Sequence, residues 1–212
     1  KIDQSSCNKD FSCVNGFCPS FVSVIGAEIK KSTTEQLKIP DIPDVTVPSI
    51  DKTYNIVVTG IGGTGVVTIG ALLGMASHIE GKGAGVMEMA GLAQKGGAVH
   101  IHCRIAESPE DISVVRVASG EAHTLIGGDL LVSAGEKTLA LLRRDQSKVV
   151  CNEMEAITGD FTRDTEFTLP SDGMKLAINA KVGPDSVQYI NANRISSKYL
   201  GDTIFSNTVL LG

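Results

Sequence analysis

The chain has 212 residues, which is long enough to bury a hydrophobic core in one or two domains. Its net charge of −5 leaves no basic footprint for nucleic acid. No apolar stretch approaches the length that spans a bilayer, and the sequence shows no secretory signal. We therefore expect a cytoplasmic protein without nucleic acid or membrane among its partners. The five cysteines are an odd number, which argues against a disulfide framework.

Three of the cysteines, Cys7, Cys13 and Cys18, crowd into the start of the chain, and Pro19 follows the last of them. Thiolates this close in an intracellular chain usually coordinate a metal or a cluster, and a cysteine followed by proline is frequent in bacterial ferredoxin loops. We therefore predict that residues 1–29 form a cysteine-rich iron–sulfur segment with these three cysteines as ligands. A four-cysteine site needs one more ligand, which would have to lie upstream.

Residues 30–53 contain several prolines and little periodicity, which predicts an extended linker. From residue 54 onward, short β-branched runs alternate with helix-like runs, so residues 54–212 are predicted to form an α/β domain. The expected fold is a three-layer, Rossmann-like sandwich with a mostly parallel sheet. We expect strands at residues 55–59, 84–89, 98–105, 130–133, 148–152 and 187–190, and helices at residues 66–79, 136–144, 171–181 and 204–211.

The strongest local signal is a glycine-rich loop between the first expected strand and the first expected helix. Its glycines satisfy the pattern G-x-G-x-x-G in the strand–loop–helix context that this pattern requires. Such glycines permit a sharp turn, a close approach of backbone to a phosphate, and close packing of helix on strand. The helix start adds free N–H groups and the positive end of the helix dipole. We therefore predict a phosphate-bearing ligand at this loop, which consists of Gly60, Ile61, Gly62, Gly63, Thr64 and Gly65.

Several segments resemble one enzyme family. Asp3–Cys13 and Gly16–Phe21 resemble a segment of the large fused indolepyruvate ferredoxin oxidoreductases. The glycine loop followed by Gly91–Val99 resembles the gamma-type domain of the 2-oxoacid:ferredoxin oxidoreductases, and so do His102–Ile105, Ile157–Phe161 and Leu200–Leu211. The resemblance covers nearly the whole chain, and the motifs follow one another in the family's order.

The resemblance implies an enzyme in which thiamine diphosphate attacks a 2-oxo acid and carbon dioxide leaves. Electrons then pass through [4Fe–4S] clusters to ferredoxin, and the acyl group is released as a CoA thioester. Thiamine diphosphate belongs to other domains of such enzymes, so the resemblance implies no catalytic residue in this chain. The expected partners are the thiamine-binding domains, ferredoxin, CoA and the 2-oxo acid, in an oligomeric enzyme.

The same resemblance suggests where CoA and the cluster would be held. The CoA phosphates would lie at the glycine loop, where Lys95, Gly96 and Gly97 would add a cation and a close backbone approach. The cysteine-rich segment would be the tail of a ferredoxin-like domain in a longer polypeptide. Its cluster would then depend on ligands that precede residue 1.

Two other interpretations explain part of the sequence. An NAD(P)-dependent Rossmann dehydrogenase would account for the glycine loop and for Glu88 as a ribose ligand, but not for the cysteines. A zinc-stabilised α/β interaction module would account for the cysteines but leave the loop unused. His100 and His102 lie two apart on an expected strand and so face the same side, where they could begin a metal site. Because no third ligand is evident, we expect both histidines to be structural.

Overall fold

A computed structural model describes residues 25–26, 49–50, 52–91, 97–156, 166 and 168–212. The predicted cluster ligands and most of the predicted linker lie outside the described residues, as do two residues of the predicted ligand site. The individually predicted residues outside this range are Cys7, Cys13, Cys18, Lys95 and Gly96.

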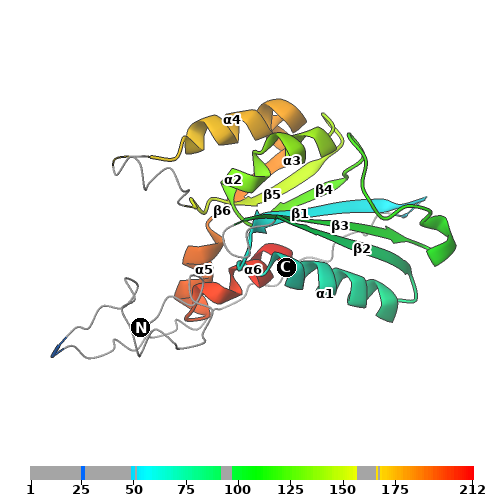
Figure 1. Cartoon of the computed structure of the whole chain (residues 1–212), viewed down its shortest axis with the longest axis horizontal. Coiled ribbons are helices and arrows are strands. Elements are labelled where there is room, and N and C mark those ends of the chain that lie inside the picture. Colours follow the sequence, from blue (N-terminus) through cyan, green and yellow to red (C-terminus); the bar gives the residue numbers. More distant parts are fainter. Residues whose placement is uncertain (1–24, 27–48, 51, 92–96, 157–165, 167) are drawn as a thin grey trace.

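The described part of the chain is an α/β sandwich of three layers, with a six-stranded sheet between two groups of helices (Figure 1). One group contains α1, α5 and α6, and the other contains α2, α3 and α4. This confirms the predicted three-layer α/β fold. The strands are β1 (Tyr54–Ile61), β2 (Gly83–Ala90), β3 (Ala98–Ala106), β4 (Thr124–Gly127), β5 (Lys148–Asn152) and β6 (Val187–Ile190). The helices are α1 (Val66–Ile79), α2 (Leu130–Ser133), α3 (Glu136–Leu141), α4 (Ser171–Val182), α5 (Ala192–Tyr199) and α6 (Ser206–Leu211).

The strands follow one another across the sheet in the order β2-β3-β1-β4-β5-β6. β1, β4, β5 and β6 pair in parallel, whereas β3 is antiparallel to both of its neighbours, β1 and β2. The sheet is therefore mixed: its parallel part was predicted, but the insertion of β3 between β1 and β2 was not. The connections from β1 and β4 lead to opposite edges, so the carboxyl ends of these two strands form a topological switch point.

The central strand β1 shows how the sequence builds the two layers of core. Its run Ile56, Val57 and Val58 is buried on both faces of the sheet. Because side chains alternate along a strand, Ile56 and Val58 join the cluster under α1 and α6, while Val57 joins the cluster under α2 and α4. A continuous β-branched run is what such a doubly covered strand requires.

One predicted strand is wrong. Residues 130–133 form the short helix α2, and the strand of this unit, β4, lies just before it at Thr124–Gly127. Asp129 separates the two elements and starts the helix, because its Oδ1 accepts a hydrogen bond from the Val132 N–H at 2.8 Å. Leu130 and Val132 are buried, so the helix has the same apolar composition as a buried strand.

Among the described residues, no helix combines the length and the apolar character needed to cross a membrane.

Candidate functional site

The glycine loop makes a tight turn from β1 into α1, as predicted. Gly63 and Gly65 have positive φ angles of 98° and 83°, a region that side chains with a Cβ rarely adopt. The turn is closed at Ile61, whose carbonyl oxygen accepts from the Thr64 N–H at 3.2 Å and from the Thr64 hydroxyl at 2.7 Å. Gly63 is exposed, so the outer side of the loop is open to solvent.

Two glycines of the pattern are required by packing inside the domain. A Cβ at Gly60 would lie 2.6 Å from Cγ2 of Val66, and a Cβ at Gly65 would collide with the side-chain amide of Asn207 on α6. Asn207 also donates from Nδ2 to the Gly65 carbonyl oxygen at 3.4 Å. The C-terminal helix therefore lies against the start of α1, and the presence of Gly60 and Gly65 does not by itself imply a ligand.

Gly65→Ala is expected to lower the free energy of unfolding by about 2 kcal/mol. An alanine here would have to adopt the unfavourable left-handed backbone conformation, and its Cβ would collide with the Asn207 side chain. Chemical denaturation measures the loss. A second substitution, Asn207→Gly, removes the collision but leaves the backbone cost. The loss caused by Gly65→Ala should therefore be smaller in that background, and an equal loss in both backgrounds would contradict the contact.

Asp129, at the end of β4, fixes the inner side of the glycine loop. It is fully buried, and its Oδ2 accepts from the Ile61 N–H at 2.8 Å while Oδ1 caps α2. Burial raises the pKa of Asp129, and the N–H groups of Val132, Ile61 and Leu131 lower it, with burial dominant. The carboxylate therefore occupies the inner side of the loop, while the outer side, at Gly63, is open to solvent.

Asn152, at the end of β5, is a second buried polar side chain at the carboxyl ends of the parallel strands. Its Nδ2 donates to the Gly128 carbonyl oxygen at 3.1 Å and to Asn193 Oδ1 at 2.7 Å, and its Oδ1 accepts from the Ala192 N–H at 3.1 Å. The carboxyl ends of the central parallel strands are thus tied to one another by side chains. Asp129 and Asn152 were not predicted from the sequence, although an aspartate directly before an apolar run is a recognisable helix-start signal.

Gly97 is the one residue of the second predicted motif that the structure describes, and it lies against the loop. The Gly62 N–H donates to the Gly97 carbonyl oxygen at 2.8 Å, and the Gly91 N–H donates to the Ala98 carbonyl oxygen at 3.1 Å. The connection between β2 and β3 therefore ends beside the glycine loop at Gly97, whereas its start at Gly91 is bonded to β3. Gly97 and Gly62 are therefore neighbours in the fold.

Glu88 does not lie where a dinucleotide-binding acid is expected. It is exposed on β2, and β3 separates β2 from β1. Because neighbouring strands are about 4.8 Å apart, the backbone at Glu88 is about 10 Å across the sheet from β1. In a dinucleotide-binding fold the acidic strand is the direct neighbour of the strand that precedes the loop. The structure therefore weakens the dehydrogenase interpretation.

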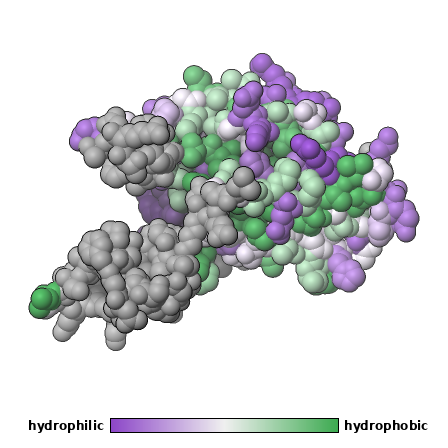
Figure 2. Space-filling view, in the orientation of Figure 1, coloured by the Kyte–Doolittle hydropathy of each residue, from purple (hydrophilic) through white to green (hydrophobic). Residues whose placement is uncertain are grey.

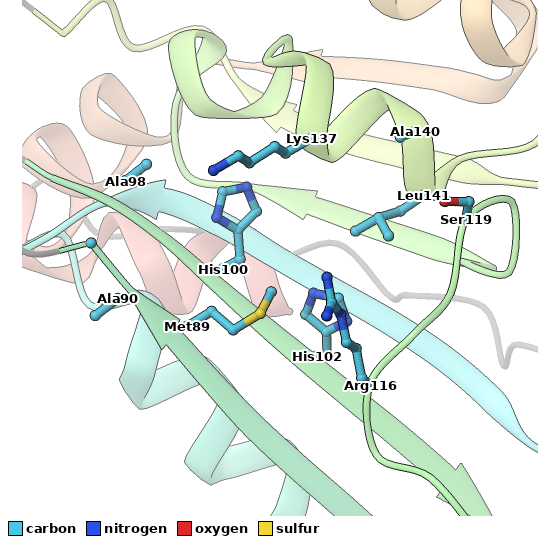
Figure 3. A pocket seen from close by; sticks show the side chains of 11 residues that line it. Met89, Ala90, Ala98, His100, His102, Arg116, Ser119, Lys137, Ala140 and Leu141 are labelled. Atoms are coloured by element: carbon cyan, nitrogen blue, oxygen red, sulfur yellow. The ribbon is translucent and has the colours of Figure 1, made fainter.

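A cavity of about 520 Å³ lies on the face of β3 that is turned toward α3 (Figure 3). His100 and His102 both point to this face, as their spacing predicted. Within the described ranges, no group of three or more His, Cys, Asp or Glu side chains could hold a metal ion. The cavity is lined by Met89, Ala90, Gly91, Ala98, His100, His102, Arg116, Ser119, Lys137, Ala140 and Leu141.

Comparisons with known proteins agree on one family. The family described as "Pyruvate ferredoxin/flavodoxin oxidoreductase" matches residues 55–212. The chain is 29% identical over 160 residues to the indolepyruvate oxidoreductase subunit IorB of Methanothermobacter thermautotrophicus, a match that covers 75% of this chain and 76% of that protein. It is 28% identical over 158 residues to the subunit of the same name from Archaeoglobus fulgidus, over 74% of each chain.

Among solved structures, the fold is similar to that of the pyruvate oxidoreductase subunit PORC from Thermotoga maritima. The TM-score is 0.52 at 17% identity, and the match covers 76% of this chain and 74% of that chain. A likeness at this identity supports the fold alone.

Proposed function

The chain belongs to the pyruvate ferredoxin/flavodoxin oxidoreductase family, and we propose that it is the gamma-type part of an indolepyruvate ferredoxin oxidoreductase. The intact enzyme would decarboxylate an aryl 2-oxo acid oxidatively, release an acyl-CoA, and pass electrons through [4Fe–4S] clusters to ferredoxin. The observation that carries the proposal is the family match over the whole described α/β domain. The two relatives named as indolepyruvate oxidoreductase subunits support the choice of branch.

We propose a separate role for each part of the enzyme. Thiamine diphosphate, held by partner domains, would supply the decarboxylation. Residues 54–212 would contribute to CoA binding, and residues 1–29 would contribute Cys7, Cys13 and Cys18 to an iron–sulfur cluster completed by ligands outside this sequence. Residues 30–53 would link the two parts.

The outer side of the glycine loop suits the phosphates of CoA. The cap residue of α1, Gly65, has no side chain that could satisfy the free N–H groups, and the first turn of α1 has no acidic residue to neutralise them. Val67 and Thr68, in the same turn, are exposed. We propose that Gly62, Gly63 and this turn hold a CoA phosphate, with Lys95–Gly97 from the neighbouring connection adding a cation.

The test is Gly62→Val in the intact enzyme. Valine can make the same N–H bond to the Gly97 carbonyl oxygen, and we propose that its side chain would crowd the bound phosphate. Loss of one hydrogen bond to a charged phosphate corresponds to about a tenfold or larger rise in the KM for CoA, at an unchanged melting temperature. Gly173→Val is the matched control, because a Cβ at Gly173 would meet nothing within 4 Å. An unchanged KM for CoA in a folded Gly62→Val enzyme would overturn the CoA assignment.

The outer face of α1 supports the proposal that this domain docks onto partner domains. Val67, Leu72, Met75 and Ile79 are exposed there, and Ile79 keeps 77% of its surface accessible. Green, apolar patches interrupt the polar surface in the region of α1 (Figure 2). A helix that is apolar on its inner and its outer sides is expected where both sides are covered. We propose that thiamine-binding partner domains cover the outer side.

A further inference from the structure

The hydrogen bonding of His102 determines which of its ring nitrogens carries the proton. Its side chain is buried, with 1% of its surface accessible, and its Nδ1 accepts from the Val117 N–H at 2.9 Å. A nitrogen that accepts cannot carry a proton, so the proton lies on Nε2. Nε2 is buried and has no hydrogen-bond partner in the described part of the chain. A buried donor without an acceptor is unfavourable, and this one belongs to a side chain that lines the cavity.

His100 is arranged in the same way. Its Nε2 lies 3.1 Å from Oγ1 of Thr138, and the Thr138 hydroxyl donates its single proton to the Val132 carbonyl oxygen at 2.7 Å. The hydroxyl oxygen must therefore accept, so His100 also carries its proton on Nε2. Burial, assisted by Lys137, lowers the pKa of His100. The imidazole of His100 is thus held in place by α3 and forms a fixed wall of the cavity.

The charges around the cavity are all of one sign. The lining contains four basic side chains and no carboxylate. Arg116 comes from the segment after β3 and Lys137 from α3, and both side chains are exposed at the rim. Neither of them forms an ion pair with a carboxylate among the described residues. The rest of the lining is largely apolar, and Met89 and Leu141 are its largest apolar side chains.

We propose that this cavity binds an organic anion whose carboxylate or phosphate group accepts hydrogen bonds from Arg116 and Lys137, and from His102 once the atoms that cover its Nε2 move aside. The apolar part of the ligand packs against Met89 and Leu141. An oxyanion supplies an acceptor for His102 Nε2, and in a partly enclosed site it balances two cations that form no ion pair with a described carboxylate. The cavity volume of about 520 Å³ accommodates the apolar part of the ligand as well as its anionic group. The site borders the glycine loop, because Ala98 of the lining pairs with Ile61, but Arg116 and Lys137 lie outside the loop and its neighbouring motif.

The experiment titrates the full chain with phenylacetate and with phenyl phosphate while the imidazole Nε2–H of His102 is followed by nuclear magnetic resonance. Phenylacetamide is the uncharged control probe. We expect a saturable shift of the Nε2–H signal with an anionic probe and none with phenylacetamide. The probe that binds more tightly identifies the head group as carboxylate or phosphate.

Three variants test the residues. Arg116→Gln should weaken binding about tenfold, since it removes one charge-assisted bond. Arg144→Gln is the matched control, because Arg144 is an exposed arginine that does not line the cavity. His102→Asn should also weaken binding, since asparagine retains an acceptor for Val117 but has no donor that reaches the cavity. The proposal is overturned if neither anion shifts the Nε2–H signal, or if Arg116→Gln and Arg144→Gln bind the anion equally well.

Discussion

Asp129→Asn is expected to destabilise the domain by about 2–4 kcal/mol. The two carboxylate oxygens of Asp129 accept from two different N–H groups, those of Ile61 and Val132, each at 2.8 Å. An amide has only one acceptor atom, so its NH₂ group would face one of these N–H groups. The variant loses one hydrogen bond to a charged group and leaves a buried donor opposed by another donor.

Asp202→Asn provides the matched control for this prediction. Asp202 also accepts from a backbone N–H, that of Ile204 at 3.1 Å, but it is exposed and water can replace the lost contact. We expect a loss of a few tenths of a kcal/mol there. Urea denaturation of both variants measures the difference. Similar losses for Asp129→Asn and Asp202→Asn would show that Asp129 does not hold the glycine loop.

The stability of the domain should fall between pH 6.5 and pH 4 because of His102. Burial, assisted by His100, Arg116 and Arg104, lowers the pKa of His102 from 6.5 to about 4. As the pH falls through this window, His102 binds a proton in the unfolded chain but stays neutral in the folded chain. The free energy of unfolding therefore decreases. At 1.36 kcal/mol per pKa unit the total loss is about 3 kcal/mol, and below pH 4 this group contributes no further change.

Comparison with His102→Asn isolates this effect from the titration of carboxylates. Asparagine retains an acceptor for the Val117 N–H and does not titrate, so the variant should lack the His102 component of the pH dependence. The measurement is the free energy of unfolding at several pH values for both proteins. Parallel curves for the wild type and His102→Asn would contradict a lowered pKa for His102.

Most of the elements were predictable from the sequence because local patterns determine them. The β-branched run at Ile56–Val58 and the glycine loop after it define β1 and the start of α1. The error at residues 130–133 has a local cause as well, since a four-residue apolar run suits a buried strand and a buried helix equally. Asp129 distinguishes the two, because it supplies the first hydrogen bond of α2.

The position of β3 could not be predicted in the same way. Strand order depends on pairing between distant residues, and the alternation of histidines with apolar residues in β3 is equally compatible with either direction. The antiparallel placement of β3 decides that Glu88 lies away from the glycine loop. It also brings His100 and His102 to the face that α3 closes only in part.

The candidate site was predictable only in part for a similar reason. The pattern of glycines indicated the loop, but the pattern cannot show that Gly65 is required by Asn207, which is 142 positions away in the sequence. The cavity brings together side chains from β2, β3, the segment before β4, and α3. No spacing in the sequence connects Arg116 and Lys137 with His102.

Anaerobic reduction of a viologen dye by the intact enzyme tests the proposed function most directly. The substrates are indolepyruvate, pyruvate or 2-oxoglutarate, each with and without CoA, and NAD is offered as a competing acceptor. From the proposed function we expect dye reduction that requires both indolepyruvate and CoA. Reduction of NAD without reduction of the dye would contradict it and would make the glycine loop a dinucleotide site.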